Sequence, residues 1–160
     1  MPHARISLRF AIWLPILGML ALFAPPGVAS ALPAPLDLRA EEAAGGHTIQ
    51  RHVEKSEAAL RARLARETSI PAASSFTDIA TAEREIAAAL HHRSAAIDVW
   101  AQASGGSPVH AFTYNANRVV GHGVVRATGK LQEMTKVQIV LRKTSFGGRK
   151  AFLLTAYPAL

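Results

Sequence analysis

The 160-residue chain contains no cysteine, and aromatic residues make up only 6% of it. Without cysteine the protein can form no disulfide, no thiolate metal site and no cysteine nucleophile. The sequence also lacks the H-E-x-x-H zinc motif, the P-loop and the G-x-S-x-G nucleophile elbow. Its seven histidines follow no regular metal-ligand spacing. We therefore expect neither a resident metal nor a cofactor.

The N-terminus has the features of a secretory signal peptide. Arg5 and Arg9 precede an apolar run over residues 10–24, and residues 29–31 form an A-x-A cleavage site. The run is shorter than the roughly 20 residues of a spanning helix, and Pro15 interrupts it. We expect cleavage at this site, export to the periplasm or out of the cell, and no stable membrane insertion afterwards. An uncleaved membrane anchor is the alternative.

The rest of the chain is long enough for one domain with a substantial core. We predict three regions: a signal peptide over residues 1–31, a linker over 32–44 with a proline-rich start, and a single domain over 45–160 that begins at a glycine pair. We expect this domain to be a monomer.

Positive charge exceeds negative charge in the predicted mature chain. Without Arg5 and Arg9, the 18 basic residues fall to 16 against 11 acidic ones, a net charge of +5 with neutral histidines. A small basic exported protein favours polyanions such as nucleic acid or an anionic surface. The same charge could serve solubility alone, so charge does not identify the partner.

The first half of the domain has helical patterns. Ser56 is a good N-cap, and Leu60 and Leu64 after it form an apolar stripe. The predicted segments are a short helix over 47–55, a helix over 57–67, a loop over 68–75, and a long helix from Ala82, capped by Thr81, with a candidate break at Ser94.

The second half is rich in β-branched residues. Strands are predicted over residues 119–127, 134–143 and 150–157, with glycine-containing turns at 128–130 and 146–148. In the middle strand Val137, Ile139 and Leu141 alternate with polar residues, which is typical of a half-buried strand. Helices followed by an antiparallel meander predict an α+β domain, with N-terminal helices packed on a C-terminal antiparallel sheet.

The last predicted strand carries two hydroxyl groups. Because side chains alternate along a strand, Leu153, Thr155 and Tyr157 should share one face, with roughly 6 to 7 Å between positions two residues apart. Thr155 and Tyr157 could together hydrogen-bond one phosphate or its neighbouring sugar. The alternative is structural, with threonine favouring the strand and tyrosine packing at an edge.

His52 and Arg63 form a second candidate pair. A histidine with a pKa of about 6.5 exchanges protons in neutral solution, and arginine offers a charged planar fork that matches phosphate oxygens. In one continuous helix their Cα atoms would be about 16 Å apart, too far to share a phosphate. The N-cap at Ser56 implies a break, and a bend there could bring His52 back to Arg63.

Three residues are further candidates for substrate binding. His47 could be a second acid–base group or a histidine that bonds a backbone carbonyl. Lys55 could add positive potential or be an ordinary solvated lysine. His122 lies between two glycines, which let a ligand or another backbone approach a strand, and is otherwise structural.

Several segments, taken in order, resemble the bacterial RNase A-like toxin domain found at the C-terminal ends of contact-dependent growth-inhibition proteins and related polymorphic toxins. They are the Gly-Gly-His-Thr-Ile-x-x-His-Val-x-Lys-Ser start at residues 45–56, Ser74-Ser75-Phe76 and Ala82-Glu83 in the middle, and the Leu-Thr-Ala-Tyr-Pro finish at residues 154–158. The resemblance spans residue 45 to the C-terminus.

This resemblance implies an RNase A-like fold without disulfides and a ribonuclease that needs no metal. It also implies an RNA substrate and, for a toxin, an immunity protein that covers the active site in the producing cell. The family's active-site histidine, arginine, threonine and tyrosine fall on His52, Arg63, Thr155 and Tyr157.

Two features depart from the family pattern. Glu54 stands where the family commonly has glycine, which removes a flexible point between the two helices. Its carboxylate could also raise the pKa of His52 or weaken phosphate binding. In addition, the domain follows its own predicted signal peptide directly instead of a long delivery stalk.

The leading hypothesis is an exported, metal-independent ribonuclease. The 2′-hydroxyl of RNA would attack the adjacent phosphorus and give a 2′,3′-cyclic phosphate, with His52 as base or acid and Arg63 stabilising the developing charge. Two alternatives stay open. One is a catalytically inactive module that binds RNA or another polyanion, and the other is an envelope interaction protein that keeps its N-terminal anchor.

Overall fold

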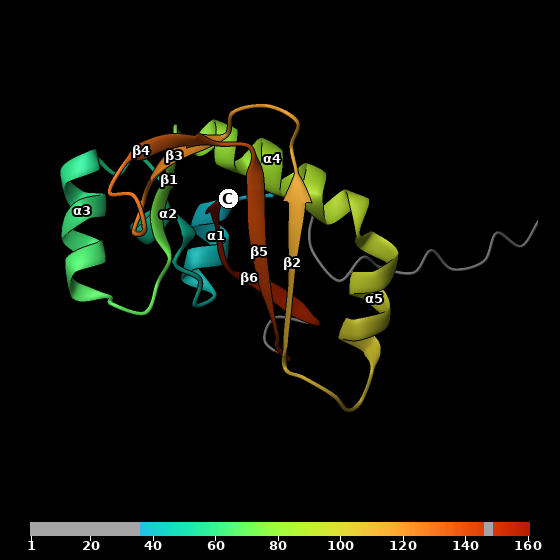
Figure 1. Ribbon diagram of the computed structural model, residues 1–160. Coiled ribbons are helices and arrows are strands. Elements are labelled where there is room, and N and C mark those ends of the chain that lie inside the picture. Colours follow the sequence, from blue (N-terminus) through green and yellow to red (C-terminus); the bar gives the residue numbers. More distant parts are fainter. Residues whose placement is uncertain (1–35, 146–148) are drawn as a thin grey trace, which may run out of the picture.

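The computed structural model describes residues 36–145 and 149–160 (Figure 1). The predicted signal peptide over residues 1–31 and the turn predicted at residues 146–148 lie outside the described residues. The elements are α1 (Leu38–Ala43), α2 (Thr48–His52), α3 (Glu57–Arg66), β1 (Ala72–Phe76), α4 (Ile79–His92), α5 (Ser94–Gln102), β2 (Val109–Asn115), β3 (Gly121–Val125), β4 (Leu131–Met134), β5 (Lys136–Lys143) and β6 (Ala151–Ala159). In the described ranges, no helix combines the length and apolar character needed to cross a bilayer.

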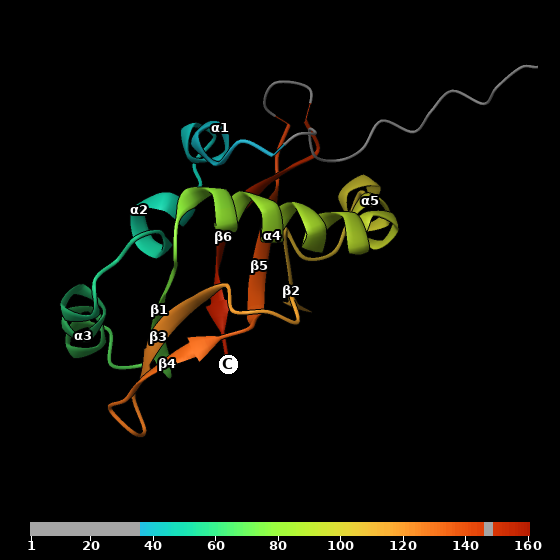
Figure 2. The same cartoon turned by 90° about the horizontal axis from the view of Figure 1, so that it is seen from above.

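The strands form two antiparallel three-stranded sheets. The first sheet has the order β1-β3-β4 and the second the order β2-β5-β6. Helix α4 contacts the second sheet through β5, while α2 and α3 lie beside β1 of the first sheet (Figure 2). The predicted α+β class is therefore confirmed, with two sheets in place of the single sheet expected and with one strand preceding the long helix.

The main core lies between α4 and the second sheet. Val137, Ile139 and Leu141 of β5 are fully buried, and the residues between them are more exposed, as the alternation predicted. Ile86 and Ala89 of α4 belong to the same buried cluster. Complete burial of one such aliphatic side chain contributes about 1.5–3 kcal/mol, so this face holds helix and sheet together.

The loop predicted over residues 68–75 is wrong in its second half, where β1 forms. Its two alanines and two serines have little β propensity, so local preference does not indicate a strand. Tertiary contacts hold it instead. β1 pairs with β3, and the Ser74 hydroxyl donates to the Pro158 carbonyl of β6 at 2.6 Å. The unpredicted strands β2 and β4 are edge strands of their sheets.

Helix α4 begins three residues before the predicted start at Ala82. Its N-cap is Asp78 and not Thr81, because the Asp78 carboxylate accepts the Thr81 backbone N–H at 2.6 Å. The candidate break at Ser94 is present, since α4 ends at His92 and α5 begins at Ser94.

Part of the region predicted as a linker is packed into the domain. Leu38 of α1 is fully buried in the main core. The buried Glu41 carboxylate accepts the Leu153 N–H at 2.7 Å and forms an ion pair with Arg149. The Glu41 carbonyl also accepts the Gly46 N–H at 2.9 Å. Helix α1 is therefore joined to β6 across more than a hundred residues of sequence.

A turn between α2 and α3 sets the direction of both helices. Val53 forms a parallel bridge with Phe76 of β1, and the Glu54 N–H donates to the Phe76 carbonyl at 3.1 Å. The Lys55 N–H donates to the Ser75 hydroxyl oxygen at 2.8 Å. The predicted cap at Ser56 follows, where the hydroxyl accepts the Ala59 N–H at 3.3 Å. The two helical segments are thus separated by a bend that β1 holds in place.

Glu54 occupies the left-handed region at this turn, with φ of 54°. A side chain in this region costs about 1–2 kcal/mol, whereas glycine adopts it freely. This is the position at which the family pattern has glycine, so the departure noted in the sequence falls at a backbone conformation that suits glycine.

We predict that Glu54→Gly increases the free energy of unfolding by about 0.5–1 kcal/mol, because relief of the left-handed strain outweighs the extra freedom of glycine in the unfolded chain. Urea denaturation measures the change. Asn117→Gly is the matched control, since Asn117 has the same φ of 54° and asparagine tolerates it better. A loss of stability in Glu54→Gly, or a larger gain at Asn117, would contradict the assignment of strain to Glu54.

Candidate active site

His52 lies at the C-terminal end of α2 and is almost completely buried, with 4% of its surface exposed. Its ring stacks on Tyr157 of β6, with centroids 5.0 Å apart and planes inclined by 26°. Its Nδ1 atom lies 3.3 Å from the Ser74 carbonyl oxygen of β1. Three elements that are distant in sequence therefore fix this imidazole.

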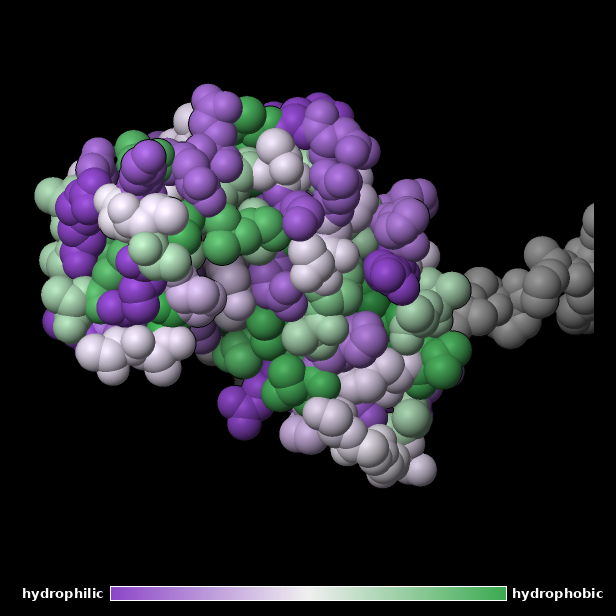
Figure 3. Space-filling model, viewed as in Figure 1, coloured by the Kyte–Doolittle hydropathy of each residue, from purple (hydrophilic) through white to green (hydrophobic). Residues whose placement is uncertain are grey.

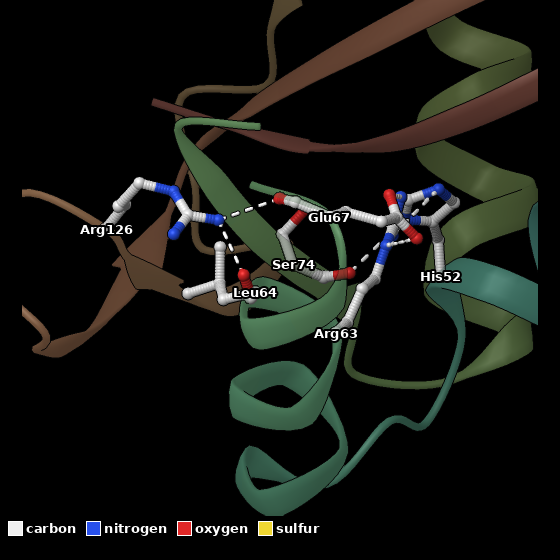
Figure 4. A network of polar contacts seen from close by, with 6 residues as sticks. All are labelled: His52, Arg63, Leu64, Glu67, Ser74 and Arg126. Carbon is white, nitrogen blue, oxygen red and sulfur yellow. Dashed lines mark hydrogen bonds and ion pairs between the residues drawn. The ribbon is translucent and has the colours of Figure 1, made fainter. Parts of the chain in front are cut away.

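Arg63 reaches His52 from the last turn of α3. Its Nη1 atom is 3.3 Å from His52 Nδ1 and 3.5 Å from Nε2 (Figure 4). The other side of the guanidinium pairs with Glu67, with Nε–Oε1 at 3.1 Å and Nη2–Oε2 at 3.2 Å. Glu67 therefore fixes the plane of the guanidinium and leaves Nη1 directed at the imidazole.

Arg126, which follows β3, holds α3 in this orientation. Its Nη2 donates to the carbonyls of Leu64 and Glu67 at 2.7 and 2.8 Å (Figure 4). Its Nε donates to the Ile70 carbonyl at 2.8 Å. These carbonyls lie at the C-terminal end of the helix, where backbone acceptors lack helical partners and a cation is favoured. The position of Arg63 thus depends on the first sheet.

The hydrogen bonds around His52 decide its tautomer. A carbonyl can only accept, and a guanidinium can only donate, so Nδ1 cannot satisfy both Ser74 and Arg63. We assign the proton to Nδ1, because the buried Ser74 carbonyl then gains a donor. The Nε2 lone pair is left on the side of Arg63, where it can accept a proton from a ligand.

The surroundings of His52 strongly favour its neutral form. Burial, then the Arg63 charge, and to a smaller extent His47 and Arg51 together lower its pKa to about 3, against an opposite effect of the hydrogen bond with the Ser74 carbonyl. The pKa of His47 is also lowered, first by burial and then by Arg51. The carboxylate of Glu54, predicted as a feature that could raise the pKa of His52, is not among the causes of the shift.

Thr155 and Tyr157 lie on the same face of β6. Thr155 pairs with Val140 and Tyr157 with Gln138, two positions apart on both strands. Leu153, which we predicted on this face, points to the opposite side. A β-bulge at Leu154 shifts the register, so that Leu153 pairs with Leu141 and is fully buried in the core.

The Thr155 hydroxyl is buried and has no hydrogen-bond partner among the described residues. Such an orphaned group is costly, and in native proteins it calls for an explanation such as a ligand or water. It lies two residue pairs along the sheet from Tyr157, on the face that carries the His52 stack.

A cavity of about 300 Å³ opens at this cluster. Its polar lining consists of His52, Arg63, Ser74, Gln138 and Tyr157, and its apolar lining includes Ile70, Pro71, Ala72, Met134 and the C-terminal residues 158–160. The cavity therefore holds an acid–base group, a permanent cation and a phenol side by side.

The structure does not gather all the predicted binding residues in this cavity. Neither Thr155 nor His47 lines it, although His47 is close enough to influence the pKa of His52. Lys55 lines a second cavity beside it. His122 Nε2 donates to the Lys55 carbonyl at 3.3 Å, which is a structural contact. Among the described residues, no three His, Cys, Asp or Glu side chains form a group that could hold a metal.

Sequence reasoning missed four contributors. Glu67 was detectable, since it stands four residues after Arg63 and such pairs meet on a helix. Gln138 lies on the polar side of a strand that the sequence predicted. The Ser74 carbonyl and the grip of Arg126 on α3 involve backbone atoms brought together by the fold, which no residue pattern indicates.

The fold and the site together define a disulfide-free α+β domain of the RNase A-like type. Residues 46–158 match the family model of the bacterial CdiA-CT RNAse A domain, and the chain belongs to this family of contact-dependent growth-inhibition toxin domains. It is also similar to a chain in the crystal structure of a CdiA-CT/CdiI complex from Y. kristensenii 33638. The identity is 30% and the TM-score 0.64, over 72% of this chain and 100% of that one. No curated protein matches. The family resemblance read from the sequence is confirmed.

We predict that Arg63→Gln raises the pKa of His52, because it removes the second-largest cause of the lowering while leaving burial in place. The pKa should remain below about 6.5, the value of a solvated histidine. NMR titration of the imidazole C–H signals measures it. Arg142→Gln, which removes an exposed arginine elsewhere, should leave the pKa of His52 where it is. An unchanged value in Arg63→Gln would contradict the coupling.

We further predict that acid destabilises the fold through His52. Between about pH 6.5 and pH 3 the unfolded chain binds a proton at this histidine that the folded state does not, so this contribution to stability is lost as pH falls. His52→Gln should show a shallower decline of unfolding free energy over that range. The exposed His91→Gln should decline as the wild type does. Equal slopes in wild type and His52→Gln would refute the assignment.

Proposed function

We propose that this domain is a ribonuclease that cleaves RNA without a metal, by attack of the 2′-hydroxyl on the neighbouring phosphorus. The observation that supports it best is the convergence of His52, Arg63 and Tyr157 on one cavity in a member of an RNase A-like toxin family. The three come from α2, α3 and β6, so their proximity is a property of the fold.

In the proposed reaction the nucleophile belongs to the substrate. The O2′–P bond forms while the P–O5′ bond breaks, which gives a 2′,3′-cyclic phosphate and a 5′-hydroxyl. His52 Nε2 takes the proton of the 2′-hydroxyl as general base. The Tyr157 hydroxyl donates a proton to the departing 5′-oxygen, and the solvent restores it.

Arg63 would stabilise the charge that develops on the non-bridging oxygens. Arg63 lines the cavity and Glu67 holds its guanidinium plane, so Nη1 would only have to shift from the His52 ring to a phosphate oxygen. The buried Thr155 hydroxyl does not line the cavity, so a local movement on substrate binding would have to expose it before it donates to the phosphate or to the adjacent sugar.

Substrate binding would also correct the weak basicity of His52. With a pKa of about 3, the imidazole of the free enzyme is a poor proton acceptor. A phosphate anion beside Arg63 offsets the positive charge that contributes to this low value. The pKa of His52 therefore rises when RNA binds, and the base gains strength only when the substrate is present.

A second candidate function is a module that binds RNA without cleaving it. The low pKa of His52 favours it, as does the Glu67 carboxylate, which neutralises part of the Arg63 charge in the empty site. This candidate keeps the fold and the cavity but predicts that RNA stays intact.

The biological setting that we propose is that of an exported monomeric toxin. The predicted signal peptide over residues 1–31 would direct export to the periplasm or the medium. The similar chain from Y. kristensenii 33638 was solved in complex with CdiI. By analogy, an immunity protein would cover the cavity around His52 in the producing cell.

We predict that the purified protein cleaves mixed RNA in the presence of EDTA and leaves DNA intact, because DNA lacks the 2′-hydroxyl nucleophile. His52→Ala should lower the rate by a factor of about 10² to 10⁴, the range for loss of a general base. Arg63→Gln should lower it by about 10² to 10³. Gel electrophoresis of the products, with detection of cyclic phosphate ends, measures both.

The matched control is His91→Ala, because His91 is exposed on α4 and lies outside the cavity. Cleavage of DNA at the same rate, or loss of activity on chelation, would refute the mechanism. Tight RNA binding without cleavage, unaffected by His52→Ala, would instead support the non-cleaving module.

A further inference from the structure

A second cavity, of about 330 Å³, adjoins the first and shares Arg63 with it. Arg51 of α2, Lys55 of the turn and Arg66 of α3 also line it, together with one carboxylate, Glu67. Four cations therefore face a single acidic group. On the α3 side of the molecule, hydrophilic residues are interspersed with hydrophobic ones (Figure 3).

Three of these cations have no acidic partner in the described part of the chain. Among the described residues, Arg51, Lys55 and Arg66 have no carboxylate within 4.0 Å, while Arg63 pairs with Glu67. Their field extends to Glu67, whose pKa is lowered first by its hydrogen bond with Arg63 and to a smaller extent by the charges of Arg51 and Arg66. The cavity is therefore an electropositive hollow without an internal counter-ion for most of its charge.

The turn after α2 fixes the cavity as a rigid feature. Lys55 is only half-exposed, and its backbone N–H and carbonyl are both bonded, to the Ser75 hydroxyl and to His122. Leu60, which is buried, forms part of the floor. The ammonium and the two guanidinium groups are thus carried on a backbone held by the first sheet.

The chemistry of this lining fits a phosphate and not a base. Arginine forks and a lysine match phosphate oxygens. No aromatic side chain lines this cavity among the described residues, so there is no surface on which a nucleobase would stack. A contact to the backbone phosphate alone carries no sequence information.

We propose that the second cavity binds the phosphate next to the scissile one, so that the preferred substrate is an RNA strand longer than a dinucleotide. This inference rests on the proposed function, because it assumes that the scissile phosphate lies on Arg63. A strand seated there passes from the first cavity into the second at the residue that both share. Lys55 and Arg66 then hold the adjacent phosphate and increase affinity independently of sequence.

Two substrates separate this site from the catalytic cavity. We compare a dinucleotide, which has only the scissile phosphate, with a hexanucleotide that contains the same step. In the double variant Lys55→Gln/Arg66→Gln, kcat/KM for the hexanucleotide should fall about tenfold, mainly through a higher KM, while the dinucleotide rate stays within about twofold. The charge-matched control is Arg39→Gln/Lys150→Gln, at exposed positions outside both cavities, and should leave both substrates nearly unaffected.

A binding measurement keeps the test independent of cleavage. The affinity for an uncleavable 2′-deoxy hexanucleotide is followed by fluorescence anisotropy against salt concentration. Loss of the contact to the one adjacent phosphate should reduce the slope of log K against log salt by about 0.7, the value per neutralised phosphate for a single strand. Circular dichroism of the double variant verifies that it is folded.

The outcomes distinguish the two proposals. If the wild type cleaves no RNA but the salt slope falls as expected, the proposed reaction fails and the phosphate site stands. Equal losses on dinucleotide and hexanucleotide, or equal losses in the control variant, would overturn the phosphate site. An unchanged salt slope, with loss of binding to an acidic partner protein instead, would also overturn it and assign the cavity to that partner.

Discussion

The site depends above all on the attachment of the α2–α3 turn to β1. Val53 bridges to Phe76, and the next two backbone N–H groups bond to Phe76 and to the Ser75 hydroxyl. Without this attachment, these hydrogen bonds would not hold the two short helices in their bent arrangement. With it, an imidazole and a guanidinium eleven residues apart come within 3.5 Å. The first sheet acts mainly as the support for this bend.

The second sheet forms the opposite side of the site. Contacts with both sheets hold the His52 ring in place and at the same time lower its basicity. Stacking on Tyr157 and burial against β1 hold the ring still, but they also remove it from water and make the charged form unfavourable. Arg63 strengthens that effect. The His52 imidazole is therefore well positioned but weakly basic in the empty site. Its ability to accept a proton depends on the charge of the ligand in the cavity.

The sequence predicted the parts of the fold that follow from local chemistry. The cap at Ser56, the break near Ser94 and the buried alternation around Ile139 are local patterns, and the structure contains all three. β1 was missed because its alanines and serines become a strand only through contacts with β3 and β6. The bulge at Leu154 was missed because the alternating pattern of the sequence does not indicate an extra residue in the strand. This bulge determines the face on which Leu153 lies.

For the candidate site, the pairing of His52 with Arg63 could be anticipated once a bend at Ser56 was allowed, and the family resemblance supplied the two residues of β6. The restraints around them could not. Glu67 fixes a guanidinium plane, and Arg126 binds carbonyls at the end of α3; both effects depend on three-dimensional placement. The amino-acid composition does not predict such an arrangement of side chains.

Helix α1 has a consequence for how such a domain can be excised from a longer polypeptide. The family match starts at residue 46, yet Leu38 fills a place in the core and Glu41 satisfies both the Leu153 amide and the Arg149 guanidinium. A protease that cut at the family boundary would open a hole in the core and leave the partly buried Arg149 without its carboxylate partner, just before the strand that carries Thr155 and Tyr157. The smallest unit that can be released intact therefore begins at or before Asp37, whose side chain caps that helix.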